Sequence, residues 1–269
     1  MNKWPQIHAD NGPFVSSKDW SGQDRQDTEV HYHHREKSDV MMTACTSWYG
    51  GDFWEFGSGD LNTFRDFLTA FDICGMCRAY EDTNFYACDI FGKLEKDVGD
   101  ELSTYFEPYS KNGDTLSRHE NLARVHGLRI DRIYFIQGLF EDTLTPELKA
   151  KWRTSQHPTI DDSCRAKMLH LPPEHRNPKE RQIGFASIDC NLAVNYKTVF
   201  EFIFDMMAPN SYIYMDEGLQ NPDVMAQWKQ FVTWLGIKRD MNAAYVRNAG
   251  GFGSLWRLYP ITNSHPLSL

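Results

Sequence analysis

The sequence lacks any long apolar run, and its basic residues are in the minority. No stretch of about 18 consecutive apolar residues occurs in the chain of 269, so no membrane-spanning helix is expected. Residues 1–5 (MNKWP) are followed by polar residues and not by an apolar segment, which argues against secretion. With 28 Lys and Arg against 37 Asp and Glu, the formal net charge of −9 is unlike that of proteins that wrap duplex nucleic acid. We therefore expect a soluble, cytoplasmic protein that binds neither membranes nor nucleic acid.

Cysteine is also sparse, and this argues against a zinc site. Among the six cysteines, Cys74 and Cys77 form the only close pair, and no second pair completes a zinc-binding pattern. The pair lies in an apolar helical stretch, where cysteine packs as a small hydrophobic residue; a redox or metal role is the alternative. His31, His33 and His34 are clustered too. Because His33 and His34 are neighbours in sequence and would point apart, a surface or lid segment is favoured over a metal site.

The chain does contain enough apolar surface for a sizeable core. Hydrophobic residues make up 41% and aromatic residues 14%, which excludes wholesale disorder. Residues 1–50 are polar and show no sustained period, so we predict an N-terminal arm or cap there and one α/β domain over 51–269. Residues 153–181 are rich in proline and basic side chains and interrupt the pattern. A loop of this length is either a lid or a disordered insertion.

Short apolar runs alternate with helix-like stretches along the domain. Strands are predicted at 52–56, 84–88, 132–136, 183–188 and 211–215, and helices at about 61–80, 115–126, 195–208 and 222–235. Two last strands, at about 243–247 and 254–259, flank a glycine-rich turn and indicate a hairpin. Alternating strands and helices favour a parallel sheet covered on both faces, and the hairpin adds an antiparallel edge. The prediction is a doubly wound, mostly parallel, seven-stranded, Rossmann-like α/β domain.

Polar side chains, most of them acidic, lie at or directly after the ends of the first five predicted strands. In strand order these residues are Glu55, Asp89, Gln137, Asp189, and Asp216 with Glu217. Ligands of open α/β sheets bind beyond the carboxyl ends of the strands. Carboxylates brought together there repel one another unless a cation, a proton or a ligand lies between them. N-capping of the following helices, which suits Asp89 and Asp189, is the alternative explanation.

The turn after the first strand, Gly57-Ser58-Gly59, lets the backbone approach a ligand closely. The third glycine of a dinucleotide-binding fingerprint is missing, because Asn62 stands in its place. The turn is therefore less suited to binding a pyrophosphate. Asp89 is placed to accept hydrogen bonds from two ribose hydroxyls, and Glu55 suits a cationic ligand. Together these features point to S-adenosylmethionine.

Five short motifs follow one another along the chain, at 51–57 (GDFWEFG), 88–94 (CDIFGKL), 137–144 (QGLFEDTL), 188–192 (IDCNL) and 214–217 (YMDE). In this order they resemble the G-D-F-x-E-x-G, D-S-F-x-G-L, G-x-F-x-D-T-L, D-x-D-L-Y and D-D motifs of the macrocin O-methyltransferase family, the last two in part. These are metal-dependent sugar O-methyltransferases of antibiotic pathways. The resemblance implies a class I methyltransferase fold, an S-adenosylmethionine cofactor, and a divalent metal, usually Mg²⁺, that holds two sugar hydroxyls.

By position, the resemblance places Asp189 at the acid proposed as general base, and Asn191, Asp216 and Glu217 at metal-ligand positions. The predicted metal ligands are Asp189, Asn191, Asp216 and Glu217. The chain departs from the family where Asn191 and Glu217 each replace an Asp, and where Ala193 replaces a Tyr. An Asn carbonyl can still bind Mg²⁺, but one negative charge is gone. We therefore expect either weaker metal binding or catalysis by the base alone.

The predicted reaction is methyl transfer from S-adenosylmethionine to a hydroxyl of a sugar or natural-product small molecule, assisted by Mg²⁺. The predicted cofactor-binding residues are Glu55, Phe56, Gly57, Ser58, Gly59, Asp89, Ile90, Phe91, Gly138, Phe140 and Asp189. The alternatives are a carboxylate, phenol or amine acceptor, a nicotinamide-dependent oxidoreductase, and a non-catalytic relative. The missing third glycine and the C-terminal hairpin count against the oxidoreductase. We also expect a homodimer or a higher homo-oligomer.

Overall fold

The computed structural model describes residues 39–44, 51–59, 83–90, 133–154, 181–190, 192–216, 221–249 and 253–261. Several sequence predictions lie outside these residues. They are the helices at 61–80 and 115–126, the Cys74–Cys77 pair, the histidine cluster, most of the 153–181 segment, and the site residues Phe91, Asn191 and Glu217.

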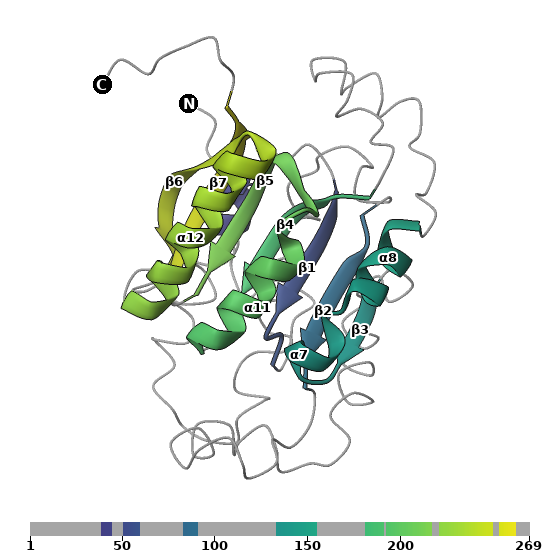
Figure 1. The fold of residues 1–269 in the computed structure, drawn as a ribbon. Helices are drawn as coiled ribbons and strands as arrows, with labels where there is room; N and C mark the ends of the chain where they lie inside the picture. Colours follow the sequence, from purple (N-terminus) through teal and green to yellow (C-terminus); the bar gives the residue numbers. More distant parts are fainter. Residues whose placement is uncertain are drawn as a thin grey trace, which may run out of the picture.

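A seven-stranded sheet forms the centre of the described fold (Figure 1). The strands are β1 (Asp52–Phe56), β2 (Phe85–Asp89), β3 (Ile133–Gln137), β4 (Ile183–Ile188), β5 (Met207–Met215), β6 (Met241–Ala249) and β7 (Gly253–Pro260). Their order across the sheet is β3-β2-β1-β4-β5-β7-β6. Strand β7 runs antiparallel to its neighbours β5 and β6, and β1 to β5 pair in parallel. The predicted sheet with its antiparallel C-terminal hairpin is therefore confirmed.

The labelled helices α7 (Phe140–Thr143), α8 (Pro146–Thr154), α11 (Ala193–Ile203) and α12 (Pro222–Arg239) lie in front of the sheet in Figure 1. Residues 39–44 are helical and lie behind β5 and β7, where Thr43 Oγ1 accepts a hydrogen bond from Arg247 Nη1 of β6 at 3.3 Å. No helix in the described ranges is long and apolar enough to cross a membrane.

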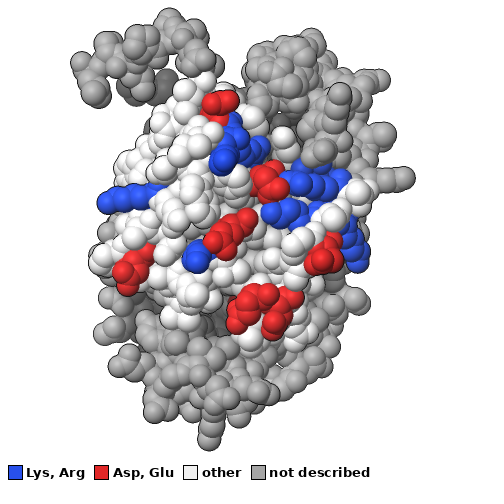
Figure 2. Space-filling view, in the orientation of Figure 1, with Lys and Arg blue, Asp and Glu red and all other residues white. Residues whose placement is uncertain are grey.

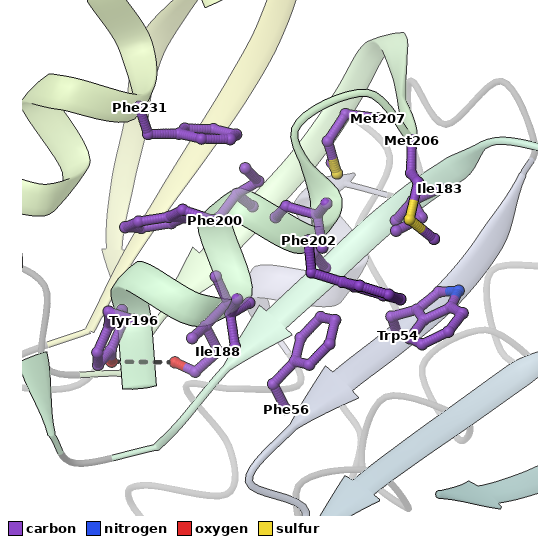
Figure 3. Packing of buried hydrophobic residues seen from close by; sticks show 14 of the residues in the cluster. Trp54, Phe56, Ile183, Ile188, Tyr196, Phe200, Phe202, Met206, Met207 and Phe231 are labelled. Atoms are coloured by element: carbon purple, nitrogen blue, oxygen red, sulfur yellow. Dashed lines mark hydrogen bonds between the residues drawn. The ribbon is translucent and has the colours of Figure 1, made fainter. Parts of the chain in front are cut away.

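The main core fills the space between the sheet and helices α11 and α12 (Figure 3). Alternate side chains of a strand point to one face. Trp54 of β1 points toward α11, where its ring centroid lies 5.5 Å from that of Phe202. Phe200 of α11 stacks on Phe231 of α12 at 4.8 Å and joins the two helices. Each such side chain contributes about 1.5–3 kcal/mol when fully buried.

The opposite face of the sheet is buried as well. Phe53 of β1 stacks on Phe185 of β4 with ring centroids 5.5 Å apart, and both side chains are fully buried. Tyr212 of β5 continues this row at 6.5 Å from Phe185. Strands that carry apolar side chains on both faces are typical of a parallel sheet covered on both sides, as the sequence predicts.

Charged side chains of both signs are interspersed on the helical face shown in Figure 2. Asp205, which follows α11, accepts from Lys149 Nζ at 2.7 Å and pairs with Arg153 Nη2 at 2.8 Å. Burial favours the neutral form of Asp205, but the hydrogen bonds from Lys149 and Arg153 outweigh this and lower its pKa. The two basic residues belong to α8, so the cluster ties α8 to the end of α11.

A buried polar cluster lies at the amino ends of β1 and β4. Asp52 Oδ2 accepts from Arg181 Nη1 and from Trp152 Nε1, each at 2.8 Å, and Asp52 Oδ1 accepts from Asn84 N at 3.1 Å. Burial raises the pKa of Asp52 to about 6, while the positive charge of Arg181 acts in the opposite direction. Trp152 lies near the end of α8 and Arg181 lies just before β4, so one carboxylate holds both flanks of residues 155–180.

The boundary between α11 and β5 differs from the prediction. The helix predicted at 195–208 ends at Ile203, and β5 begins at Met207 instead of 211. Met207 pairs with Ile183 of β4, so an apolar residue that continues the helical pattern belongs to the sheet. Propensity and periodicity are here overridden by pairing with a buried neighbouring strand.

Two further differences concern helices. Helix α12 continues past the predicted end to Arg239, and Asp240 then adopts φ 49 and donates its N–H to Leu235 O. Helices α7 and α8 are not predicted at all. Helix α8 buries only Trp152, so its sequence carries no apolar period that would reveal it.

Candidate functional site

Backbone hydrogen bonds fasten the turn after β1 to the neighbouring strands. Gly57 N donates to Cys88 O at 2.8 Å, and Asp189 N donates to Phe56 O at 2.8 Å. Gly57 has φ +85, and a Cβ at this position would lie 1.9 Å from Asp189 O. Only glycine allows so close an approach of two backbones. The carboxyl ends of β1, β2 and β4 therefore meet at this turn.

The second glycine of the turn is open and is bonded to the carboxylate that ends β2. Gly59 N donates to Asp89 Oδ2 at 3.0 Å. Gly59 has φ +49, and a Cβ placed on it would have no atom of the described residues within 4 Å. Ser58, in contrast, is buried, and its hydroxyl donates to Glu55 O at 3.4 Å. The structure thus brings the predicted glycine turn and Asp89 together and leaves space at Gly59.

The end of β3 joins the same edge of the sheet. Gly138 N donates to Asp89 O at 3.0 Å, next to the partly buried Ile90. Phe140 is buried, and its ring lies edge-on to that of Phe56 at 6.2 Å. The side chains of Phe56 and Phe140 therefore belong to the core, and any contact of Phe56 with a ligand at the rim would come from its backbone.

The buried phenol of Tyr214 contacts Asp216, the acidic residue that follows β5. Asp216 N donates to Ile188 O at 3.0 Å, which places Asp216 beside the end of β4. The hydroxyl of Tyr214 donates to Asp216 Oδ1. Burial raises the pKa of Tyr214 well above its ordinary value, and the charges of Asp216 and Asp189 raise it further. The phenol is therefore neutral at physiological pH, and its hydroxyl contacts Asp216, one of the predicted metal ligands.

Glu55 lies on the sheet face opposite α11, where it is fully buried. It pairs in register with Ser187 of β4, which is also fully buried and whose hydroxyl has no hydrogen-bond partner within the described part of the chain. Burial raises the pKa of the Cys88 thiol, and Asp89 and Glu55 raise it further. The negative charges of β1 and β2 therefore lie near one another.

The residues at the end of β4 and β5 suit Mg²⁺ in their chemistry. Mg²⁺ is usually bound in proteins through one or two carboxylates together with water or substrate oxygens, and Asp189 and Asp216 supply two carboxylates. Among the described residues, no group of three or more His, Cys, Asp and Glu side chains is arranged to hold a metal ion. Two of the four predicted ligands, Asn191 and Glu217, lie outside that part of the chain.

The fold is shared with a solved O-methyltransferase. No protein-family model and no curated protein matches the sequence. The structure of the O-methyltransferase NovP matches with a TM-score of 0.56 and 13% identity, over 85% of this chain and 87% of that one. A second match is TomG from Streptomyces achromogenes, an O-methyltransferase involved in tomaymycin synthesis that was solved in complex with SAM; its TM-score is 0.47 and its identity 10%, over 84% of this chain and 79% of that one. A third is the calicheamicin methyltransferase CalS11, with a TM-score of 0.47 and 15% identity, over 85% of this chain and 81% of that one.

At 13% identity the match to NovP establishes the architecture of the chain. The sheet order, with its antiparallel C-terminal pair, is part of this shared architecture. The fold implied by the sequence motifs is therefore confirmed, and membership of the macrocin O-methyltransferase family stays a prediction.

Proposed function

We propose that this protein is an S-adenosylmethionine-dependent O-methyltransferase that methylates a hydroxyl of a sugar or natural-product small molecule. The observation that carries the proposal is the juxtaposition at the carboxyl ends of β1, β2 and β4. There the open turn at Gly59 is bonded to Asp89, and Gly57 of the same turn contacts the backbone of Asp189. A methyltransferase sheet supports the same conclusion, since its ligands bind at this edge.

The donor site that we propose consists of the glycine turn and two carboxylates. The open space at Gly59 admits the amino acid portion of the donor close to the backbone. Asp89, which is partly exposed, accepts hydrogen bonds from the ribose hydroxyls. Buried Glu55 contributes a negative charge that favours a cationic ligand. Residues of two adjacent strands, β1 with its turn and β2, therefore match the three chemical parts of the donor.

Asp189 would act as the general base. S-adenosylmethionine supplies a methyl group on a sulfonium, so the leaving group needs no protonation. Asp189 takes the proton of the acceptor hydroxyl while the oxygen–methyl bond forms and the sulfur–methyl bond breaks. Mg²⁺, held by Asp189 and Asp216 with Asn191 and Glu217, would lower the pKa of that hydroxyl. Alignment of the two reactants by the rim residues contributes several kcal/mol more.

Calorimetry with S-adenosylhomocysteine tests the donor site. We expect Asp89→Ala to weaken binding by about 1.5–3 kcal/mol, because hydrogen bonds to a charged group are lost. Asp223→Ala, an exposed change in the first turn of α12, serves as the control and should bind like the wild type. Wild-type affinity of Asp89→Ala would contradict the ribose assignment. Failure of the wild type to bind would favour the non-catalytic alternative.

A screen of acceptors tests the reaction class. Sugars, phenols, carboxylates and amines are each incubated with the donor, and methylated products are identified by mass spectrometry. Asp189→Asn should abolish turnover of a hydroxyl acceptor, and Asn191→Asp should tighten Mg²⁺ binding. Methylation of only carboxylates, phenols or amines would replace the proposed acceptor class. The homodimer or higher homo-oligomer that we propose is checked by light scattering.

A further inference from the structure

We infer that Tyr214 is a positioning residue, whose phenol holds the carboxylate of Asp216 in the orientation that a cation requires. This inference rests on the proposed function, because it assigns a role within the Mg²⁺ site. It goes beyond the predicted ligand set, which contains no residue of the β5 interior.

The position of Tyr214 suits this role. Tyr214 is fully buried and is the second-last residue of β5, in register with Ser187 of β4. Asp216 is the first residue after the strand and is partly exposed. Tyr214 and Asp216 are two residues apart, so their side chains leave the backbone on the same side. The phenol reaches along the strand and donates to Asp216 Oδ1.

The contact links a buried side chain to a partly exposed one at the end of the strand. The strand ladder between β4 and β5 ends with the pair Ile188 and Met215, so Asp216 stands just beyond the last paired residue. A phenol that is packed inside the sheet has two side-chain torsions, both fixed by burial, and its bond to a carboxylate is charge-assisted. Such outer partners orient metal-binding carboxylates, and their removal typically costs 10–100-fold in metal affinity.

The same strand offers a matched control. Tyr212 lies on the same face of β5 as Tyr214, two residues further from the rim, and is also buried. Its ring stacks on Phe185 at 6.5 Å. Tyr212→Phe therefore removes the same hydroxyl group from the same layer of the core without touching the carboxyl end of the strand.

The test is calorimetric titration of the full chain with Mg²⁺ alone. We expect Tyr214→Phe to weaken Mg²⁺ binding by roughly 10–100-fold and Tyr212→Phe to bind Mg²⁺ as the wild type does. Both variants should keep wild-type affinity for S-adenosylhomocysteine. In an Asp216→Ala background, Tyr214→Phe should cause no further loss, because the phenol acts through Asp216.

Three results would overturn the inference. These are equal Mg²⁺ affinity of Tyr214→Phe and the wild type, equal loss in Tyr214→Phe and Tyr212→Phe, and a full further loss in the Asp216→Ala background. Absence of Mg²⁺ binding by the wild type would overturn it together with the metal assignment. In that case, binding of S-adenosylhomocysteine would still support the proposed methyltransferase.

Discussion

Two glycines of one turn have different surroundings, and this difference can be measured. A Cβ on Gly57 would meet the backbone of Asp189 at 1.9 Å, whereas within the described ranges a Cβ on Gly59 would meet nothing within 4 Å. Gly57→Ala should lower the free energy of unfolding by about 3 kcal/mol or more, since backbone strain of order 1–3 kcal/mol is added to the clash. Gly59→Ala should cost only about 1–2 kcal/mol, yet its methyl group would enter the proposed donor site.

Urea unfolding and calorimetry together check this pair. Gly59→Ala should be folded at room temperature and should bind S-adenosylhomocysteine more weakly than the wild type. A Gly57→Ala variant that is no less stable than Gly59→Ala would contradict the close approach of Gly57 to Asp189.

The buried ion pair at the other end of the sheet predicts a large effect of a single substitution. Arg181→Met leaves the Asp52 carboxylate buried without its cation and should lower the free energy of unfolding by about 3–5 kcal/mol at neutral pH. Lys197→Met is the control, because it breaks an exposed pair with Glu201 on α11. Its effect should stay below about 0.5 kcal/mol. Equal losses in the two variants, followed by chemical unfolding, would contradict the buried pair.

The loss caused by Arg181→Met should depend on pH. Burial raises the pKa of Asp52 to about 6 with Arg181 present, and removal of the cation raises it further. A carboxyl group whose folded pKa exceeds its unfolded value of about 3.9 makes the fold more stable as the pH falls from the folded pKa toward the unfolded one. Because the folded pKa of Asp52 is higher in the variant, this gain in stability begins at a higher pH in the variant than in the wild type. Its deficit should therefore be smaller at about pH 5 than at about pH 8, and a constant deficit would contradict the raised pKa.

At the scale of single elements, helix α12 begins with a side-chain cap. Asn221 Oδ1 accepts from Asp223 N at 3.0 Å and from Val224 N at 3.3 Å. Asn221→Ala should lower the free energy of unfolding by about 1 kcal/mol, and Asn221→Asp should restore most of it. Thermal unfolding measures the effect, and donor binding should not change, because α12 packs over the C-terminal strands. A loss of donor affinity would show that α12 influences the site.

The elements differ in how clearly the sequence reveals them. Strands β1 and β4 occur at the predicted bounds, because each is a short apolar run between polar residues or glycines. The start of β5 is hidden, since Met207 suits the apolar face of a helix as well as a buried strand. Helix α8 is held by Trp152 and by the charges around Asp205, contacts between distant parts of the chain that no local period reports.

The candidate site, too, is predictable from the sequence only in part. The carboxylates at the strand ends are predictable, because parallel strands deliver their carboxyl ends to one edge of a sheet. The bond from Gly59 to Asp89 and the pairing of Asp52 with Arg181 join residues 30 and 129 positions apart, which sequence reasoning alone does not place. The contact of Tyr214 with Asp216 is not among the sequence predictions. The position of Tyr214 two residues before Asp216 does indicate that the two side chains lie on the same face of the sheet.

At the scale of the whole molecule, donor binding should stabilise the fold. A ligand that binds only the folded state adds about 2.7 kcal/mol at a concentration of 100 times its Kd. S-adenosylhomocysteine at this excess should therefore raise the midpoint of thermal unfolding of the wild type, and less so of Asp89→Ala at the same concentration. A chelator should leave the midpoint of the ligand-free protein unchanged, because the core lies between the sheet and helices α11 and α12. Unfolding by a chelator would instead indicate a structural metal.

The contacts of Asp52 give three elements one common anchor. Trp152 near the end of α8 and Arg181 just before β4 both donate to the same carboxylate oxygen of β1. Each bond holds the carboxylate in the place that the other one needs, so the loss of either partner is felt by both. Asp52 therefore works as a keystone: damage to α8, β1 or β4 at this end of the sheet reaches the other two elements.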